Sequence, residues 1–186
     1  MKPVSLLVLL LAFAALLVPG PGARAERASS SSTAPSPMPP SDRHFLEDAA
    51  VADTAEIVYG TLAAQKAFSP LVREFGQTMV NQHARGLDAL RQLAARRGVT
   101  LQLRLTSDQI SQRNRLTRLG GVFFDRAYVV AMARDHKERV AMYERETNFG
   151  GDPEVMSLAA RTLPTLRQHL IRAQELAGQR PRDSAK

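Results

Sequence analysis

The sequence contains no cysteine and no tryptophan among its 186 residues. The absence of cysteine excludes disulfide bonds, a cysteine nucleophile and the modified cysteine that anchors an exported bacterial lipoprotein. A small exported domain often depends on disulfides for its stability. This chain must therefore obtain its stability from a packed core, which its length allows.

Aromatic residues make up only 5% of the chain, whereas Ala, Leu, Arg and Gln recur throughout. This composition favours helices over sheets, whose strands are rich in Val, Ile and Tyr. The sequence also has no Gly-rich phosphate loop and no Ser/His/Asp arrangement in a strand–turn context. We therefore expect an all-α protein that is not an enzyme of these classes.

Long apolar runs are scarce, and the one at residues 4–18 follows Lys2 and precedes a small-residue pattern that ends at Ala25. This pattern predicts a secretory signal peptide over residues 1–25. The alternative is an uncleaved anchor, although the run is shorter than the ~20 residues that span a bilayer. Residues 26–40 are rich in Ser and Pro and predict a disordered linker. We therefore expect a mature chain without a transmembrane helix, exported to the periplasm or cell envelope.

Basic residues exceed acidic ones, with 25 Lys and Arg against 18 Asp and Glu and a net charge of +7. Cleavage of the signal peptide would remove Lys2 and Arg24 and leave +5. We expect no nucleic-acid partner, because the arginines are dispersed along predicted helix faces without interleaved aromatics. The run Arg113, Arg115 and Arg118 is typical of a solvated helix face. The alternative is a weak association of this basic segment with anionic envelope components, either polymers or lipid headgroups.

Apolar residues at 3–4 spacing predict four long helices, over residues 41–67, 69–97, 121–149 and 152–176. Ser-Pro and Asp-Pro start signals lie just before the second and fourth helices, so only tight turns precede them. The longer connection between the second and third helices contains a predicted short helix that ends near Leu119. The pattern therefore predicts an antiparallel four-helix bundle over residues 41–178 with a long crossover, followed by a polar tail over residues 179–186.

Each long helix carries one histidine or glutamate near its midpoint, on its predicted apolar face: Glu56, His83, His136 and His169. Glu56 and His83 lie 12 and 15 residues from the first turn, and His136 and His169 lie 15 and 18 residues from the last turn. A difference of three residues is ~4.5 Å of rise, less than one helical turn. We therefore predict that all four residues occupy one layer of the core.

Two interpretations of this layer remain open. Buried histidines that hydrogen-bond to carboxylates or hydroxyls form polar layers that fix helix register in bundle cores. The alternative is a metal site, since one Glu and three His on facing helices suit a single Zn, Fe, Mn or Cu ion. The Glu-x-x-His pairs of di-iron carboxylate sites are missing.

Four neighbouring residues bear on the metal interpretation. Met79 and Met132 lie one turn before His83 and His136, where they are either core filler or sulfur ligands that would favour copper. Asp135 and Glu144 are candidates for outer hydrogen-bond partners of the metal ligands. Surface ion pairing is the alternative for both carboxylates.

Several short motifs resemble a family known as the domain of unknown function DUF4142, exported bacterial proteins often labelled outer membrane proteins. The motifs are Phe45, Glu56-Ile57, Leu62-Ala63, Met79-Val80 with His83, Gly121-x-x-Phe124-Asp125-x-x-Tyr128, Met132-x-x-x-His136 and Leu163-Pro164-x-Leu166-x-x-His169-Leu170. The resemblance implies a ferritin-like topology and adds Asp125 and Tyr128 to the residues of interest around the site. The family usually shows Asp directly before the histidine of the second helix, whereas this chain has Gln82.

Three functions follow from these observations. The first is a non-enzymatic, exported envelope protein with a central Glu/His polar layer. The alternative is a periplasmic metal-binding or redox and metal stress protein that uses the same layer. The third is an interaction module whose basic crossover binds an anionic polymer.

Overall fold

The computed structural model describes residues 37–178, so the predicted signal peptide, most of the linker and the predicted polar tail lie outside the described residues. Five helices and no strand are found in the described part: α1 (Pro40–Lys66), α2 (Pro70–Arg96), α3 (Ser107–Arg118), α4 (Gly121–Phe149) and α5 (Pro153–Gly178). The predicted helices begin and end within two residues of these bounds. The all-α bundle is therefore confirmed, with α3 as the short helix of the crossover.

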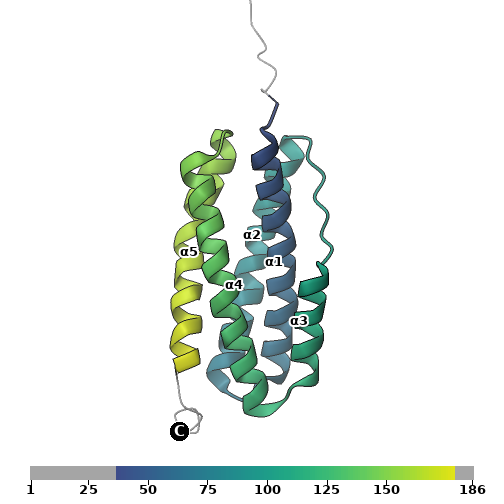
Figure 1. Ribbon diagram of the computed structural model, residues 1–186, viewed down its shortest axis with the longest axis vertical. Coiled ribbons are helices and arrows are strands. Elements are labelled where there is room, and N and C mark those ends of the chain that lie inside the picture. The colour runs from purple at the N-terminus through teal and green to yellow at the C-terminus, as the bar shows by residue number, and fades with distance from the viewer. Residues whose placement is uncertain (1–36, 179–186) are drawn as a thin grey trace, which may run out of the picture. The chain divides into compact units, whose positions relative to one another are not determined.

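The four long helices form two antiparallel hairpins, with α1 packed along α2 and α4 packed along α5 (Figure 1). The two hairpins contact each other less extensively, through α1 with α4 and α2 with α5. The crossover after α2 runs along the outside of the bundle and places α3 beside α1. No helix in the described part is long and apolar enough to cross a membrane.

Small residues allow α1 and α2 to approach closely. A Cβ added at Gly60 would lie 2.8 Å from the backbone oxygen of Gly76, and one added at Gly76 would lie 2.7 Å from Ala63. Both distances are far below van der Waals contact, so a side chain at either glycine would push the helices apart.

Two buried aspartates fasten the turns at opposite ends of the bundle. Asp125 in α4 accepts hydrogen bonds from the backbone N–H groups of Phe68 (2.9 Å) and Ser69 (2.7 Å) in the α1–α2 turn. Asp42 in α1 accepts hydrogen bonds from Gly151 and Asp152 in the α4–α5 turn. Asp42 therefore connects the two hairpins.

The hydrophobic core is divided into two clusters by a polar layer. On α2, Met79 belongs to one cluster and Leu87 to the other, and His83 lies between them. His136 and His169 are likewise flanked by one cluster on each side along α4 and α5. The division agrees with the common height that residue counting predicts for these histidines.

Candidate metal centre

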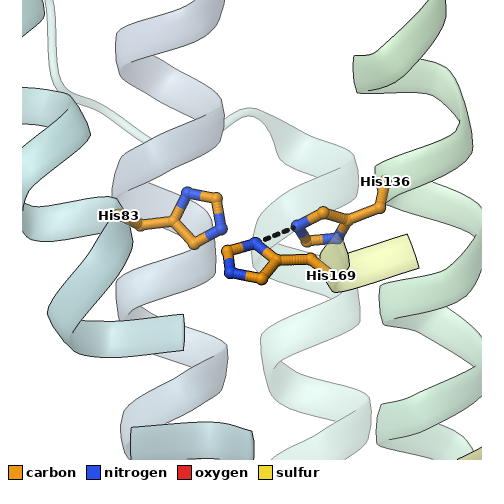
Figure 2. A group of neighbouring side chains, drawn as sticks. All are labelled: His83, His136 and His169. Atoms are coloured by element: carbon orange, nitrogen blue, oxygen red, sulfur yellow. Dashed lines mark hydrogen bonds between the residues drawn. The ribbon is translucent and has the colours of Figure 1, made fainter. Parts of the chain in front are cut away.

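Three buried histidines from three helices meet in the polar layer (Figure 2). His83 comes from α2, His136 from α4 and His169 from α5, and their ring centroids lie 5.1 to 5.4 Å apart. One ring nitrogen from each histidine lies within 4.8 Å of the nitrogens of the other two. The three rings therefore point toward one small volume between the hairpins.

Each ring has one nitrogen fixed by a hydrogen-bond acceptor. His83 Nδ1 donates to Asp53 Oδ1 (2.7 Å), and His136 Nδ1 donates to the backbone oxygen of Met132 (3.0 Å). His169 Nε2 donates to Gln82 Oε1 (2.7 Å). Since a neutral imidazole carries one proton, the second nitrogen of each ring is left with a free lone pair.

These lone pairs face one another. His136 Nε2 and His169 Nδ1 lie 3.2 Å apart, which is the hydrogen-bond distance marked in Figure 2. With the tautomers above, both nitrogens present a lone pair and neither carries a proton for this bond. His83 Nε2 is buried and has no hydrogen-bond partner among residues 37–178. Three lone pairs directed into one small volume repel each other, and a cation bound between them would remove the repulsion.

Burial keeps these rings neutral. It lowers the pKa of His169 to about 3 and the pKa of His136 well below its ordinary value. Burial also lowers the pKa of His83, although the hydrogen bond to Asp53 opposes that change. At neutral pH the three side chains are therefore in the form that binds metal ions.

Asp53 and Arg139 form a buried ion pair that supports His83 and joins α1 to α4. The Arg139 guanidinium donates to Asp53 Oδ1, the same oxygen that accepts from His83. Burial alone would raise the pKa of Asp53, but Arg139 and the His83 hydrogen bond hold it below its ordinary value. Asp53 is therefore an ionised carboxylate behind an imidazole, as in many carboxylate–histidine–metal arrangements.

Glu56 lies in the same layer but outside the group of three nitrogens. Its Oε1 is 3.9 Å from His136 Nδ1, on the side of the ring that bonds Met132, and its Oε2 has no partner in the described part of the chain. Burial raises the pKa of Glu56 to about 8. The structure therefore gathers the three histidines of the predicted set and leaves Glu56 adjacent to them as a largely protonated carboxyl at neutral pH.

The other predicted site residues divide between the core and the surface. Met79, Met132 and Tyr128 are buried, and no described residue bonds the Tyr128 hydroxyl. Asp135 accepts from Arg134, and Glu144 accepts from Arg167 on the surface.

The prediction that Asp125 lies near the histidines requires correction. Asp125 is 11 residues from His136 on the same helix, ~16 Å along the axis, where it binds the α1–α2 turn.

Two residues of the site, Asp53 and Arg139, are not among those predicted from the sequence. Each is one helical turn from a residue that was found, since Asp53 precedes Glu56 by three positions and Arg139 follows His136 by three. This spacing places both residues on the inward side of their helices. It is the feature of the sequence from which both residues could have been predicted. Gln82, noted only as a departure from the family pattern, is the residue that orients His169.

An open cavity of about 890 Å³ leads from the surface to this layer, between α1, α3 and α4. Glu56 and Arg139 line it, and both are buried. Asp48, Asp108 and Glu138 line it too and are exposed. Only Glu56 and Arg139 are shared between the cavity lining and the polar layer, so the histidines lie behind these two side chains.

The fold and the buried histidines define an all-α bundle with a candidate metal centre between its two hairpins. A model of the domain of unknown function DUF4142 matches residues 27–176, and the chain belongs to this family. No curated protein sequence matches the chain. The fold is similar to the crystal structure of a DUF305 fragment from Deinococcus radiodurans, with a TM-score of 0.69 and 16% identity over 76% of this chain and 98% of that one. At this identity the likeness concerns the fold alone.

Proposed function

We propose that this protein binds one transition metal ion through His83 Nε2, His136 Nε2 and His169 Nδ1. The observation that carries the proposal is the inward convergence of three lone pairs, each fixed by a separate acceptor on the opposite nitrogen. A polar layer that only set helix register would be completed by hydrogen bonds among its members, whereas His83 Nε2 is buried without a partner among the described residues.

The spacing of the nitrogens suits a metal ion. A tetrahedral ion with metal–nitrogen distances of about 2.0 to 2.1 Å requires nitrogens about 3.3 to 3.4 Å apart. His136 Nε2 and His169 Nδ1, at 3.2 Å, already have this separation. The remaining nitrogen lies within 4.8 Å, so a rotation of the His83 side chain that moves it by at most about 1.5 Å completes the set.

The donor set favours some metals over others. Three neutral imidazoles suit Zn, Cu and Fe, whereas Mn prefers oxygen ligands. Divalent copper binds nitrogen sites more tightly than zinc does, so metal supply decides which ion occupies the site in the cell. The fourth position of a tetrahedral ion is left to water or another small ligand.

We also propose that binding takes place outside the cytoplasm, because residues 1–25 have the pattern of a signal peptide. Mass spectrometry of protein from the periplasmic fraction should then find Glu26 as the first residue. Full-length protein confined to the cytoplasm would refute this part of the proposal and leave the metal site untouched.

The metal site is tested by elemental analysis of protein purified without added chelator from metal-replete cells. We expect one equivalent of zinc or copper in the wild type and none in His136→Ala, because His136 provides one of the three nitrogen ligands. His44→Ala is the matched control, since His44 is exposed at the start of α1 and should leave the metal content unchanged. Metal-free wild type, or metal retained by His136→Ala, would sink the proposal.

A further inference from the structure

Exposed apolar side chains gather at one end of the bundle. Phe123 is 74% exposed at the start of α4, and Val122 beside it is also exposed. Phe68 is 58% exposed in the α1–α2 turn. Large aromatic rings in water are costly, and several together at one place commonly mark a contact surface.

These residues belong to one continuous end of the molecule, where α1 turns into α2 and α3 is followed by α4 (Figure 1). The backbone N–H of Phe68 donates to Asp125, two residues after Phe123. Lys66 donates to the backbone oxygens of Leu116 and Thr117 at the end of α3. The two turns therefore form one surface, which we call the aromatic end.

The apolar surface continues from this end along α4. A groove of about 430 Å³ lies between α3 and α4, and Phe123, Ala127 and Val130 line it on one stripe of the helix. The charged side chains that line the groove are all arginines, namely Arg115, Arg126 and Arg134. None of the described carboxylates lines it, so the groove combines apolar contact area with positive charge.

The charge of the aromatic end is also positive. Exposed Arg118 and Arg126 are on either side of Phe123 in the sequence, and Lys66 and Arg73 bond only backbone oxygens in the described part of the chain. The exposed carboxylate nearest in sequence to Phe68 is Glu74, and the buried Asp125 uses both of its oxygens on backbone N–H groups.

From this arrangement we propose that the aromatic end docks on a bilayer that contains anionic phospholipids, with Phe68, Val122 and Phe123 inserted among the headgroups. Apolar side chains bind the boundary between headgroups and acyl chains, and basic side chains around them are attracted to the anionic phosphates. This surface uses none of the metal-binding residues, so it is independent of the proposed metal site.

The absence of tryptophan from the chain allows a direct test with one introduced fluorophore. In the full-length protein, Phe123→Trp should shift its emission to shorter wavelength with vesicles of phosphatidylglycerol and phosphatidylcholine in equal parts, and not with phosphatidylcholine alone. Phe149→Trp is the matched control, because Phe149 is 84% exposed at the opposite end and should show no shift. Any binding by the N-terminal apolar segment is the same in both variants.

Two further variants measure the separate contributions of the apolar and the basic side chains to vesicle binding. Phe123→Ser should weaken vesicle binding about tenfold, and Arg118→Gln with Arg126→Gln should weaken it about twentyfold at low salt. The control variants Phe149→Ser, and Arg43→Gln with Arg161→Gln, should leave vesicle binding unchanged.

Equal shifts of both tryptophans, or equal binding to the two vesicle types, would overturn the proposal. So would a shift of Phe123→Trp with rising protein concentration in lipid-free solution, which would assign the surface to a second copy of the chain.

Discussion

Replacement of Arg139 by methionine is expected to lower the free energy of unfolding by about 3 to 5 kcal/mol, because it leaves the Asp53 carboxylate buried without its cation. Methionine keeps most of the apolar volume of the arginine stem, so little of this loss comes from packing. Urea unfolding of metal-free protein at neutral pH measures the difference.

Arg145→Met serves as the control, since Arg145 is exposed on the same helix and should change stability by less than about 0.5 kcal/mol. Asp53→Asn combined with Arg139→Met should recover part of the loss, because a buried pair replaced as a whole costs less than one broken in half. If Arg139→Met is as mild as Arg145→Met, water in the adjacent cavity solvates Asp53 and the pair does not hold the hairpins together.

The sequence predicted the position of the site along the bundle axis more accurately than it predicted which residues form the site. Counting residues from the turns fixes position along the bundle axis, since each residue adds ~1.5 Å, and this brought His83, His136 and His169 into one layer. Counting does not fix the rotation of each helix about its own axis. That rotation directs Glu56 toward the cavity and His136 Nδ1, away from the three converging nitrogens.

Asp53 was missed because an apolar stripe of 3–4 spacing describes a helix that is buried on one face. α1 contacts α2, α4 and α3, so a wider arc of it is buried, and that arc includes Asp53 as well as Glu56. Arg139 was missed because arginine on a helix is usually at the surface. Its charge is compensated inside the core by Asp53, which is 86 positions away in the sequence, and residue spacing along one helix does not predict this pair.

Asp125 illustrates a different limit. The family motif marks it as important, and a buried aspartate in a bundle can be either a ligand partner or the acceptor for a helix start. The distinction depends on which turn lies opposite it, and here two N–H groups at the start of α2 use both of its oxygens. The family motif therefore identified a residue that stabilises the fold and not one that belongs to the candidate metal site.

Glu56→Gln is expected to become progressively more stable than the wild type as the pH rises from 4.5 to 8, by about 4 kcal/mol in total in metal-free protein. Burial raises the pKa of Glu56 to about 8, whereas its ordinary value is 4.5. Between these values the unfolded chain loses the proton and the folded chain keeps it, so wild-type stability falls with rising pH. Each unit of difference in pKa corresponds to about 1.4 kcal/mol.

The buried histidines contribute with the opposite sign and in a different range. Their pKa values are lowered, to about 3 for His169, so their contribution is complete above pH 6.5 and is lost as the pH falls below it. Glu146, whose pKa burial raises to about 7, adds a further loss with rising pH. Both contributions are present in the wild type and in Glu56→Gln, so they cancel in the difference between the two proteins.

Urea unfolding of both proteins at several pH values, with a chelator present, therefore isolates Glu56. Glutamine has the same shape as glutamic acid, so its packing against His136 is preserved. The two proteins therefore differ only in whether the side chain at position 56 can lose a proton. Glu144→Gln, at an exposed site on the same helix as His136, provides the control for a general effect of removing one carboxylate.

A difference in free energy of unfolding between Glu56→Gln and the wild type that stays constant from pH 4.5 to 8 would mean that Glu56 is ionised in the folded protein. The cation that stabilises it would then be Arg139, shared between Asp53 and Glu56, and the polar layer would carry one more negative charge toward the metal site.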